Sequence, residues 1–487
     1  MKVLFGFLFL ILYTSFYGQV YDSVLTSGNW YKFKVSETGV HKITPDFLRQ
    51  LGLNNVDPNE IKIYGFGGRS LDLILSEQTK YDVPQVPIYV SGGEDGFFSG
   101  DDYLLFYAEA ATDNYVQEND SFVNPYSTDV YYYITTSGSD LPLRISDFQQ
   151  STDTPSVIFN TYNETQFHEE DLYNIGFQGR KWFGDKLDNS NNVVEYAFSF
   201  NDLDTSAFPR DNVRDPIISV ENMELNLNLA AVFSVVPSLN VNIISGGNSI
   251  YQTTLNLGSE PNLDLNAYKL ISEDFSVGQA LIVDNQMVVQ FSFVAGADVS
   301  AEVYLDYITL NGVSHLTWSN SQMLFVHDDV PVDGSVVQYQ FTNSTSLSQV
   351  WDVTDVYSIS KIENDANSNF SFSFVSDESK TFVAFDESNV LTPQLSASNV
   401  VLNQNLKGNI FLDESGEFED VDYLIITNSE FISAAADLAA FREANDGFTV
   451  KVVELNSIYN EFSSGRQDIS AIRNFVKYIY DLSLIHI

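Results

Sequence analysis

The chain has 487 residues, well beyond one typical domain, so two to four domains are expected. Apolar residues make up 44% and aromatic residues 14%, which favours packed, β-rich domains over a disordered chain. The formal net charge is −43, and so acidic a surface repels nucleic acid and anionic lipid. Cys is absent, which excludes a disulfide framework, so each domain must be stabilised by its own core.

Residues 1–18 have the pattern of a secretory signal peptide. Lys2 supplies the positive charge, and residues 3–13 form an apolar stretch that is too short to span a bilayer. Cleavage is expected near Gly18, just before Gln19. The pattern predicts that the protein is exported.

From about residue 20 to about residue 400, apolar residues alternate with polar ones. Such a period of two places the apolar side chains on one face of a strand. Turn residues separate the runs, as at 245–248, and many short strands with this spacing predict antiparallel β-sandwiches. The clearest alternating sets are Met223, Leu225, Leu227 and Leu229; Leu239, Val241 and Ile243; and Phe370, Phe372 and Phe374.

The β-rich part divides into three predicted modules. A first β module covers residues 19–137, a β-sandwich module covers 160–312, and a smaller β segment covers 313–400. The polar stretch 146–156 is interpreted as a loop or linker. One helix is predicted at 45–51, with Thr44 as N-cap and Gly52 as C-cap.

The pattern changes in residues 401–487. The apolar run 423–426 is typical of a strand buried on both faces of a parallel sheet. Helical spacing follows and ends at Gly447, a second strand is predicted at 448–453, and Asp468 is the predicted N-cap of another helix. These elements predict a βαβ unit followed by a loop and a helix. The residues at helical spacing are Phe431, Ala435, Leu438 and Phe441, and then Ile469, Ile472, Val476 and Ile479.

Two loops have alternative interpretations. The glycine-rich stretch 64–69 resembles a phosphate-binding loop, but the full fingerprint is missing and β-type sequence follows, which favours a tight strand turn. The acidic stretch 93–96, with Asp101 and Asp102, could hold calcium, but it lacks the alternating spacing of a known calcium loop. A solvated hairpin is the favoured interpretation.

The histidines give little support for a catalytic or metal site. His168 lies beside the acidic residues 169–171, but adjacent residues on an extended chain point in different directions, which favours a surface charge run over a metal cage. His41, His315 and His327 have no nearby partner in the sequence and are interpreted as structural. Neither a cofactor motif nor the Gly-x-Ser-x-Gly pattern of a serine hydrolase is present.

Residues 422–475 resemble the gingipain-type cysteine peptidases, whose catalytic domain is caspase-like. The resemblance rests on four segments, 422–427, 438–442, 458–465 and 468–475. The third has the sequence Ile-Tyr-Asn-Glu-Phe-Ser-Ser-Gly. The fold class is therefore expected to be multidomain, with mainly antiparallel β-sandwich modules followed by the start of an α/β caspase-like domain.

Segments further upstream resemble, within this family, the sortases of the type IX secretion system. They are 39–44, 63–68, 102–108, 179–185, 304–308 and 403–406. The resemblance implies a cell-surface, outer-membrane-associated cysteine endopeptidase and transpeptidase. It would remove the C-terminal signal of secreted cargo and attach the cargo to anionic lipopolysaccharide. Other type IX secretion components at the outer membrane would be its partners.

The resemblance also implies that the catalytic His and Cys follow later strands of the sheet, beyond Ile487. No catalytic, cofactor-binding or metal residue is therefore carried over, and His486 lies in a tail that departs from the family pattern. The chain is expected to be an inactive N-terminal part of a longer enzyme. Two alternatives remain open, a non-catalytic adhesin or glycan-binding β-sandwich protein, and a structural component of the secretion apparatus.

Overall fold

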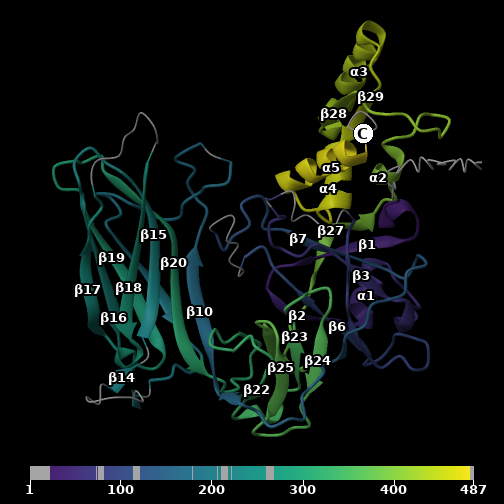
Figure 1. Cartoon of the computed structure of the whole chain (residues 1–487). Coiled ribbons are helices and arrows are strands. Elements are labelled where there is room, and N and C mark those ends of the chain that lie inside the picture. Colours follow the sequence, from purple (N-terminus) through teal and green to yellow (C-terminus); the bar gives the residue numbers. More distant parts are fainter. Residues whose placement is uncertain are drawn as a thin grey trace, which may run out of the picture.

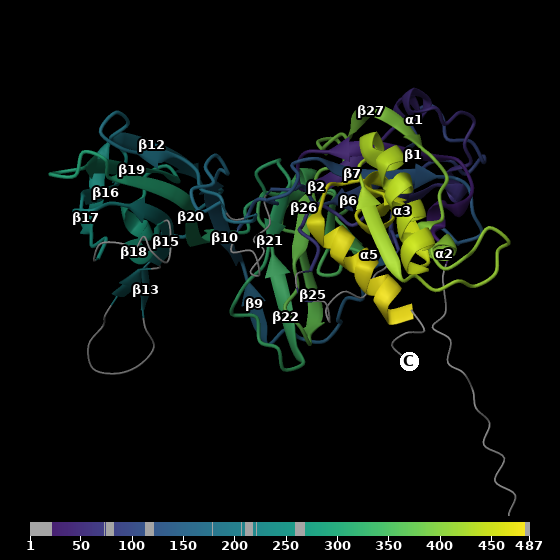
Figure 2. The same ribbon diagram turned by 90° about the horizontal axis from the view of Figure 1, so that it is seen from above.

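The computed structural model describes residues 22–72, 74, 82–112, 121–177, 179–205, 207–209, 218–220, 222–258 and 268–482. The predicted signal peptide and His486 lie outside these residues. Figure 1 shows a β-sandwich on one side, a smaller β unit in the middle, and an N-terminal β module on which an α/β unit sits. The same division is visible from above in Figure 2. The described helices include none that is long and apolar enough to cross a bilayer.

The N-terminal module consists of two sheets, one of five strands and one of three. The larger has the order β27-β1-β7-β3-β4, and the smaller has the order β2-β6-β5. Phe33, Phe106 and Tyr132 lie at the centre of the core between them. The strands are β1 (Trp30–Val35), β2 (Gly39–Ile43), β3 (Lys62–Tyr64), β4 (Gln85–Val86), β5 (Tyr89–Ser91), β6 (Tyr103–Ala108), β7 (Val130–Thr135) and β27 (Gln394–Val401).

The helix predicted at 45–51 is confirmed as α1 (Pro45–Leu51). The Thr44 side chain accepts a hydrogen bond from the backbone N–H of Phe47, and Gly52 ends the helix in the left-handed region at φ 109°. Phe47, Leu48 and Leu51 are buried against the module core. Pro45 at the first turn and Gly past the last one are therefore sufficient signals for this helix.

The second module is a sandwich of two main sheets. One sheet has the order β10-β20-β15-β18, with β11 pairing β20 as well, and the other has the order β12-β19-β16-β17. The strands are β10 (Thr161–Glu169), β11 (Lys186–Leu187), β12 (Val193–Ser199), β15 (Asn222–Val232), β16 (Ser238–Ser245), β17 (Asn248–Leu255), β18 (Lys269–Gly278), β19 (Gln286–Val294) and β20 (Glu302–His315). A separate pair is formed by β13 (Ala207–Pro209) and β14 (Ile218–Val220).

The alternation predicted for this module is confirmed. The apolar sets of β15 and β16 are fully buried in one core, whereas the intervening residues are exposed or half-buried. Residues 245–248 form the turn of the β16–β17 hairpin, with Gly246 and Gly247 at positive φ. The fold class, antiparallel sandwich modules, is thereby confirmed for this part of the chain.

The middle unit packs a five-stranded sheet, β21-β26-β23-β24-β8, against a three-stranded one, β25-β22-β9. Its core is dominated by aromatic rings, among which Phe325, Tyr339 and Phe382 lie within 6 Å of one another, centroid to centroid. The strands are β8 (Ser146–Asp147), β9 (Val157–Phe159), β21 (Met323–Phe325), β22 (Ser335–Gln340), β23 (Gln349–Asp352), β24 (Ser360–Glu363), β25 (Ser371–Ser376) and β26 (Phe382–Phe385).

The stretch 146–156 is not only a linker, because it opens with β8, which pairs in parallel with β24, and β9 follows directly. The predicted segment 313–400 likewise ends in β27, which pairs with β1 of the N-terminal module. Both strand pairings join residues that are far apart in the sequence, so the local alternation of apolar and polar residues gives no sign of them. The module boundaries themselves stay a prediction.

The α/β unit contains β28 (Tyr423–Thr427), α3 (Ile432–Asp446), β29 (Val450–Glu454), α4 (Leu455–Phe462) and α5 (Ile469–Leu482), and α2 (Leu406–Asn409) precedes it. The predicted βαβ unit is confirmed, because β28 and β29 pair in parallel. Gly447 caps α3 at φ 70°, as predicted. Five 3₁₀ helices complete the described elements: η1 (Val24–Thr26), η2 (Pro58–Glu60), η3 (Gln279–Leu281), η4 (Ser344–Ser346) and η5 (Ser429–Phe431).

Two expectations for this unit are wrong. The predicted loop before the last helix contains α4, whose Leu455, Ile458 and Phe462 recur at helical spacing. The strand β28 was expected to be buried on both faces, yet all five of its residues are only half-buried. Its sheet has just two strands, so neighbouring strands and helices that would cover it are missing from the described part.

Candidate functional site

The α/β unit contacts the N-terminal module through two loops, which we call the docking seat. One is residues 65–72, which follow β3, and the other is residues 463–468, which join α4 to α5. Behind them a single apolar cluster combines side chains of both units. Its buried members are Leu71, Ile410, Phe411, Val453, Ile458, Tyr459, Phe462, Ala471, Phe475, Tyr478 and Ile479.

Arg466 is the central polar residue of the docking seat. Its side chain is 1% exposed, and its Nη1 donates to the carbonyl oxygen of Gly67 at 2.6 Å. Its Nη2 lies 3.2 Å from Oδ2 of Asp468, which is fully buried. A buried guanidinium is tolerated only when it is paired and hydrogen-bonded, so this arrangement couples the two units tightly.

Asp468 joins the two units as well as capping a helix. Its Oδ1 accepts from the backbone N–H of Ser470 in the first turn of α5, which confirms the predicted N-cap. Its Oδ2 accepts from the backbone N–H of Leu71 at 3.2 Å. Nearby, the N–H of Phe66 donates to Oγ of Ser464 at 3.3 Å. The start of α5 is therefore fixed by the N-terminal module.

The glycine-rich stretch 64–69 serves this contact. It is a loop followed by irregular chain and not by a helix, so it is not a phosphate-binding loop, and it is longer than the predicted tight turn. A Cβ on Gly68 would lie 1.9 Å from the carbonyl oxygen of Ala110, and one on Gly65 would lie 2.5 Å from the Tyr132 ring. Only glycine permits this close approach of backbones.

A second set of hydrogen bonds holds the linker that enters the α/β unit. Glu461 on α4 accepts from the backbone N–H groups of Leu406 and Lys407 at 2.6 and 3.0 Å, and from Nε2 of Gln404 at 2.9 Å. The Tyr133 hydroxyl lies 3.3 Å from the carbonyl oxygen of Asn460. Segment 403–406, noted in the sequence for its resemblance, thus bridges β27 and α4.

Buried charges near the docking seat are paired. Lys407 Nζ lies 2.6 Å from Asp82, and Arg69 Nη2 lies 2.7 Å from Glu109. Burial raises the pKa of the Glu109 carboxyl, while Arg69 and Arg466 oppose that rise. Burial likewise raises the pKa of Glu461. The cause is desolvation with pairing, which also occurs in structural ion pairs, so these shifts alone do not indicate catalysis.

The described residues contain no Cys–His pair, although Thr161 Oγ1 lies 3.3 Å from Nε2 of His327. Cys is absent from the whole chain, and the three histidines interpreted as structural are scattered. His41 is 1% exposed, with Nδ1 3.0 Å from the carbonyl oxygen of Gly39. His315 lies 3.5 Å from Asp204, and His327 packs on Phe159.

The acidic stretch 93–96 lies in the connection of the β5–β6 hairpin, as predicted.

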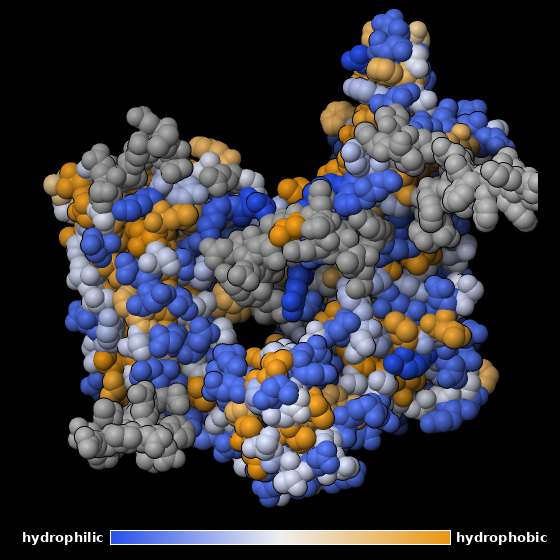
Figure 3. Space-filling model, in the orientation of Figure 1, coloured by the Kyte–Doolittle hydropathy of each residue, from blue (hydrophilic) through white to orange (hydrophobic). Residues whose placement is uncertain are grey.

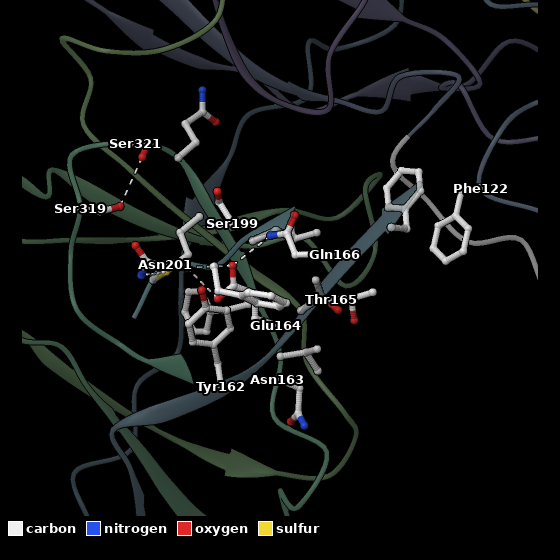
Figure 4. A pocket seen from close by; sticks show the side chains of 18 of the residues that line it. Phe122, Tyr162, Asn163, Glu164, Thr165, Gln166, Ser199, Asn201, Ser319 and Ser321 are labelled. Carbon is white, nitrogen blue, oxygen red and sulfur yellow. Dashed lines mark hydrogen bonds between the residues drawn. The ribbon is translucent and has the colours of Figure 1, made fainter. Parts of the chain in front are cut away.

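A cleft of about 630 Å³ lies between β10 and residues 319–326 (Figure 4). Its one carboxylate on β10, Glu164, already accepts from the N–H of Asn201, from Ser314 Oγ at 2.6 Å and from Gln166 Nε2 at 3.0 Å. Most of the other side chains that line it are uncharged amides, hydroxyls and rings. The described residues that line the cleft include neither a cysteine nor a histidine.

The acidic residues 169–171, at the end of β10, do not form one surface patch. Glu169 turns towards the loop before β7, where it accepts from Ser121 Oγ and from the N–H of Phe122, both at 2.6 Å. His168 and Glu170 instead lie beside Asp185, which belongs to a segment 15 residues further on. The sequence interpretation missed this partner because nothing in the local spacing signals it.

The outer end of the α/β unit leaves apolar side chains exposed. In the space-filling view of Figure 3 most of the visible face is hydrophilic, with hydrophobic residues in separate patches. On and beside α3, Phe431 is 60% exposed, Phe441 54% and Phe448 40%. Helix α3 packs on the two-stranded sheet through Ala435 and Ala439, and this packing leaves the three rings uncovered.

The comparisons with known proteins agree with this division of the chain. Residues 417–484 match the model of peptidase family C25. The crystal structure of dimeric latent PorU from Porphyromonas gingivalis matches with a TM-score of 0.72 and 24% identity over 94% of this chain. The match covers 40% of the PorU chain, so this chain spans about two fifths of that length.

Other solved structures match too weakly to show a shared fold. The infectious bursal disease virus VP2 subviral particle matches at a TM-score of 0.21 and 8% identity, over 88% of this chain and 92% of that one. The insecticidal delta-endotoxin Cry8Ea1 from Bacillus thuringiensis matches at 0.16 and 10%, over 51% and 41%. No curated protein sequence matches. The chain is thus PorU-like in fold, and its residues 417–484 match the gingipain-type peptidase family C25.

Proposed function

We propose that this chain is the N-terminal part of a cysteine endopeptidase whose β modules support and orient its catalytic domain. The observation that carries the proposal is the docking seat: the segment that matches the peptidase family is fixed to the N-terminal module through Arg466, Gly67 and Asp468. Exposed rings on and beside α3 support it further, since additional strands and helices of a complete α/β domain would cover them.

The whole enzyme would act as a sortase of the type IX secretion system. A thiolate, activated by a histidine, would attack the carbonyl carbon before the C-terminal signal of a secreted cargo protein, and the peptide C–N bond would break. The resulting acyl-enzyme would pass its acyl group to an amine on anionic lipopolysaccharide and regenerate the thiol. The residues that perform these steps would lie beyond Ile487, since Cys is absent here.

This role implies export and a location at the outer-membrane surface. The signal-like residues 1–18 support export, and the net charge of −43 suits an extracytoplasmic protein without nucleic-acid partners. The β modules would contact other secretion components. Cofactors play no part in the proposed chemistry.

The test uses the complete gene product, including the reading frame beyond Ile487. We expect that frame to encode a histidine and a cysteine, and the purified enzyme to release the C-terminal signal from a cargo peptide in a reaction that iodoacetamide blocks. A frame without a cysteine, or hydrolysis that survives iodoacetamide, would overturn the proposal. Retention of cargo at the surface by a protein without a thiol would instead favour a structural component of the secretion apparatus.

A glycan-binding adhesin would require exposed aromatic platforms on the sandwich. In the described parts of residues 222–315, the exposed large apolar side chains are all aliphatic, such as Val235, Leu270 and Val299. Aromatic residues of this module are exposed only near the loop at 173–177, within the described residues. These observations favour the scaffold role.

A further inference from the structure

Three potential metal ligands converge at one edge of the sandwich module. His168 lies on β10, Glu170 follows directly after that strand, and Asp185 precedes β11. One ligand atom from each of the three side chains lies within 4.8 Å of the other two. His168 and Glu170 are two positions apart on extended chain, so both side chains point to the same side.

The backbone is built for this convergence. A Cβ on Gly184 would lie 2.9 Å from the carbonyl oxygen of Glu170, closer than any other residue type allows. The N–H of Gly184 donates to the carbonyl oxygen of Leu305 at 2.6 Å, and the N–H of Leu305 donates to that of Asp185 at 2.9 Å. The central strand β20 therefore fixes the segment that carries Asp185 against the one that carries Glu170.

His168 has an unused nitrogen. Its Nε2 atom is enclosed and has no hydrogen-bond partner. The ring packs on Tyr196 at a centroid distance of 4.2 Å, which limits its orientation. An enclosed nitrogen without a partner costs free energy, and a bound ion would remove that cost.

Asp185 is held in place by a neighbour. The Tyr196 hydroxyl donates to Oδ2 of Asp185 at 2.8 Å, which leaves Oδ1 available. A phenol that orients a carboxylate in this way is typical of the outer shell of metal sites. Glu170 is exposed and can reorient its side chain. The ion pairs found among the described residues do not include one between His168 and either carboxylate.

We propose that His168, Glu170 and Asp185 bind one divalent transition-metal ion, with zinc as the best-suited ion, and that water completes its coordination. One imidazole and two carboxylates form a mixed nitrogen and oxygen donor set, which suits zinc and manganese better than magnesium or calcium. The ion would join the end of β10 to the segment before β11, two stretches that both pair with β20. This site is independent of the proposed peptidase function.

The test is zinc binding by the purified chain, measured by titration calorimetry in physiological salt with excess magnesium, which suppresses loose binding to an acidic surface. We expect one zinc ion per chain and a higher thermal unfolding midpoint when zinc is present. Cobalt, used in its place, should give visible absorption bands that zinc abolishes. Substitutions H168Q and E170Q should each weaken zinc binding by about tenfold or more.

The matched control is D171N, which removes one negative charge from the same run without removing a proposed ligand. It should leave zinc affinity and the cobalt bands unchanged. Because Glu170 is exposed, E170Q should preserve the fold, so its loss of binding cannot be attributed to unfolding. The proposal is overturned if zinc does not bind with saturation, or if H168Q and E170Q bind zinc as tightly as D171N does.

Discussion

The Arg466 guanidinium donates a hydrogen bond to the carbonyl oxygen of Gly67, and the two residues are 399 positions apart in the sequence. This bond joins the first β module to the segment that matches the peptidase family. Around it, Asp468 and Leu71 form a second connection between the same two loops. The docking seat is therefore a specific joint, and its parts can be tested one at a time.

Replacing Arg466 by methionine should loosen this joint. The change leaves the buried Asp468 carboxylate without its cationic partner and the carbonyl oxygen of Gly67 without this donor, which costs about 3 kcal/mol or more. We expect proteolytic cleavage within α5 to become about a hundredfold faster, since cleavage follows the population of the undocked state. R442M is the control, because the contacts of Arg442 with Asp446 and with the Tyr423 ring both lie within the α/β unit. Equal cleavage rates in the two variants would argue against a specific joint.

Replacing Gly68 by alanine should destabilise the N-terminal module. The added Cβ would overlap the backbone of Ala110, which cannot move as a side chain can, so we expect a loss of about 3 kcal/mol or more in the free energy of unfolding. The urea midpoint measures this. G179A is the matched control, since nothing lies within 4 Å of its Cβ. An unchanged midpoint in G68A would mean that the loop lies elsewhere.

His41 should make the chain sensitive to acid. Burial lowers its pKa to about 4, against 6.5 for the free side chain, so the folded protein holds the ring neutral. Above pH 6.5 the ring is neutral in both the folded and the unfolded chain, so His41 does not lower the free energy of unfolding. As the pH falls from 6.5 towards 4, only the unfolded chain takes up the proton, and the free energy of unfolding falls by about 3 kcal/mol in total. Unfolding free energies at several pH values should show a shallower decline for H41N. Parallel curves for H41N and the unmodified chain would contradict this.

The purified chain should hydrolyse no cargo-signal peptide in a thiol-dependent manner. It contains no cysteine, so the nucleophile that the family uses is absent. Peptide incubation followed by mass spectrometry checks this. Product formation that iodoacetamide prevents would show that another group performs the reaction.

The sequence predicted those features that depend on local pattern. The alternating residues of β15, the capped helix α1 and the βαβ unit with Gly447 are all present, because periodicity and caps act over a few residues. Helix α4 was missed although its spacing is helical, because the preceding strand continues into it without a break.

Features that depend on contacts between distant residues could not be predicted. The pairing of β27 with β1 and the meeting of His168 with Asp185 both require the folded chain. The same applies to Arg466, which the sequence presents as one basic residue in a loop. Its burial follows from the position of Gly67, and no local pattern encodes that position.

Hydrogen exchange of the purified chain tests whether the segment that matches the peptidase family is docked on the N-terminal module. The two long helices of the α/β unit, α3 and α5, should then exchange at different rates. Amides of α5 should be protected to a degree comparable with β1 and β7, because Phe475 and Ala471 are fully buried in the shared cluster. Amides of α3 should exchange much faster, because its outer face is exposed. If α5 exchanges as rapidly as α3, the segment is not docked on the N-terminal module.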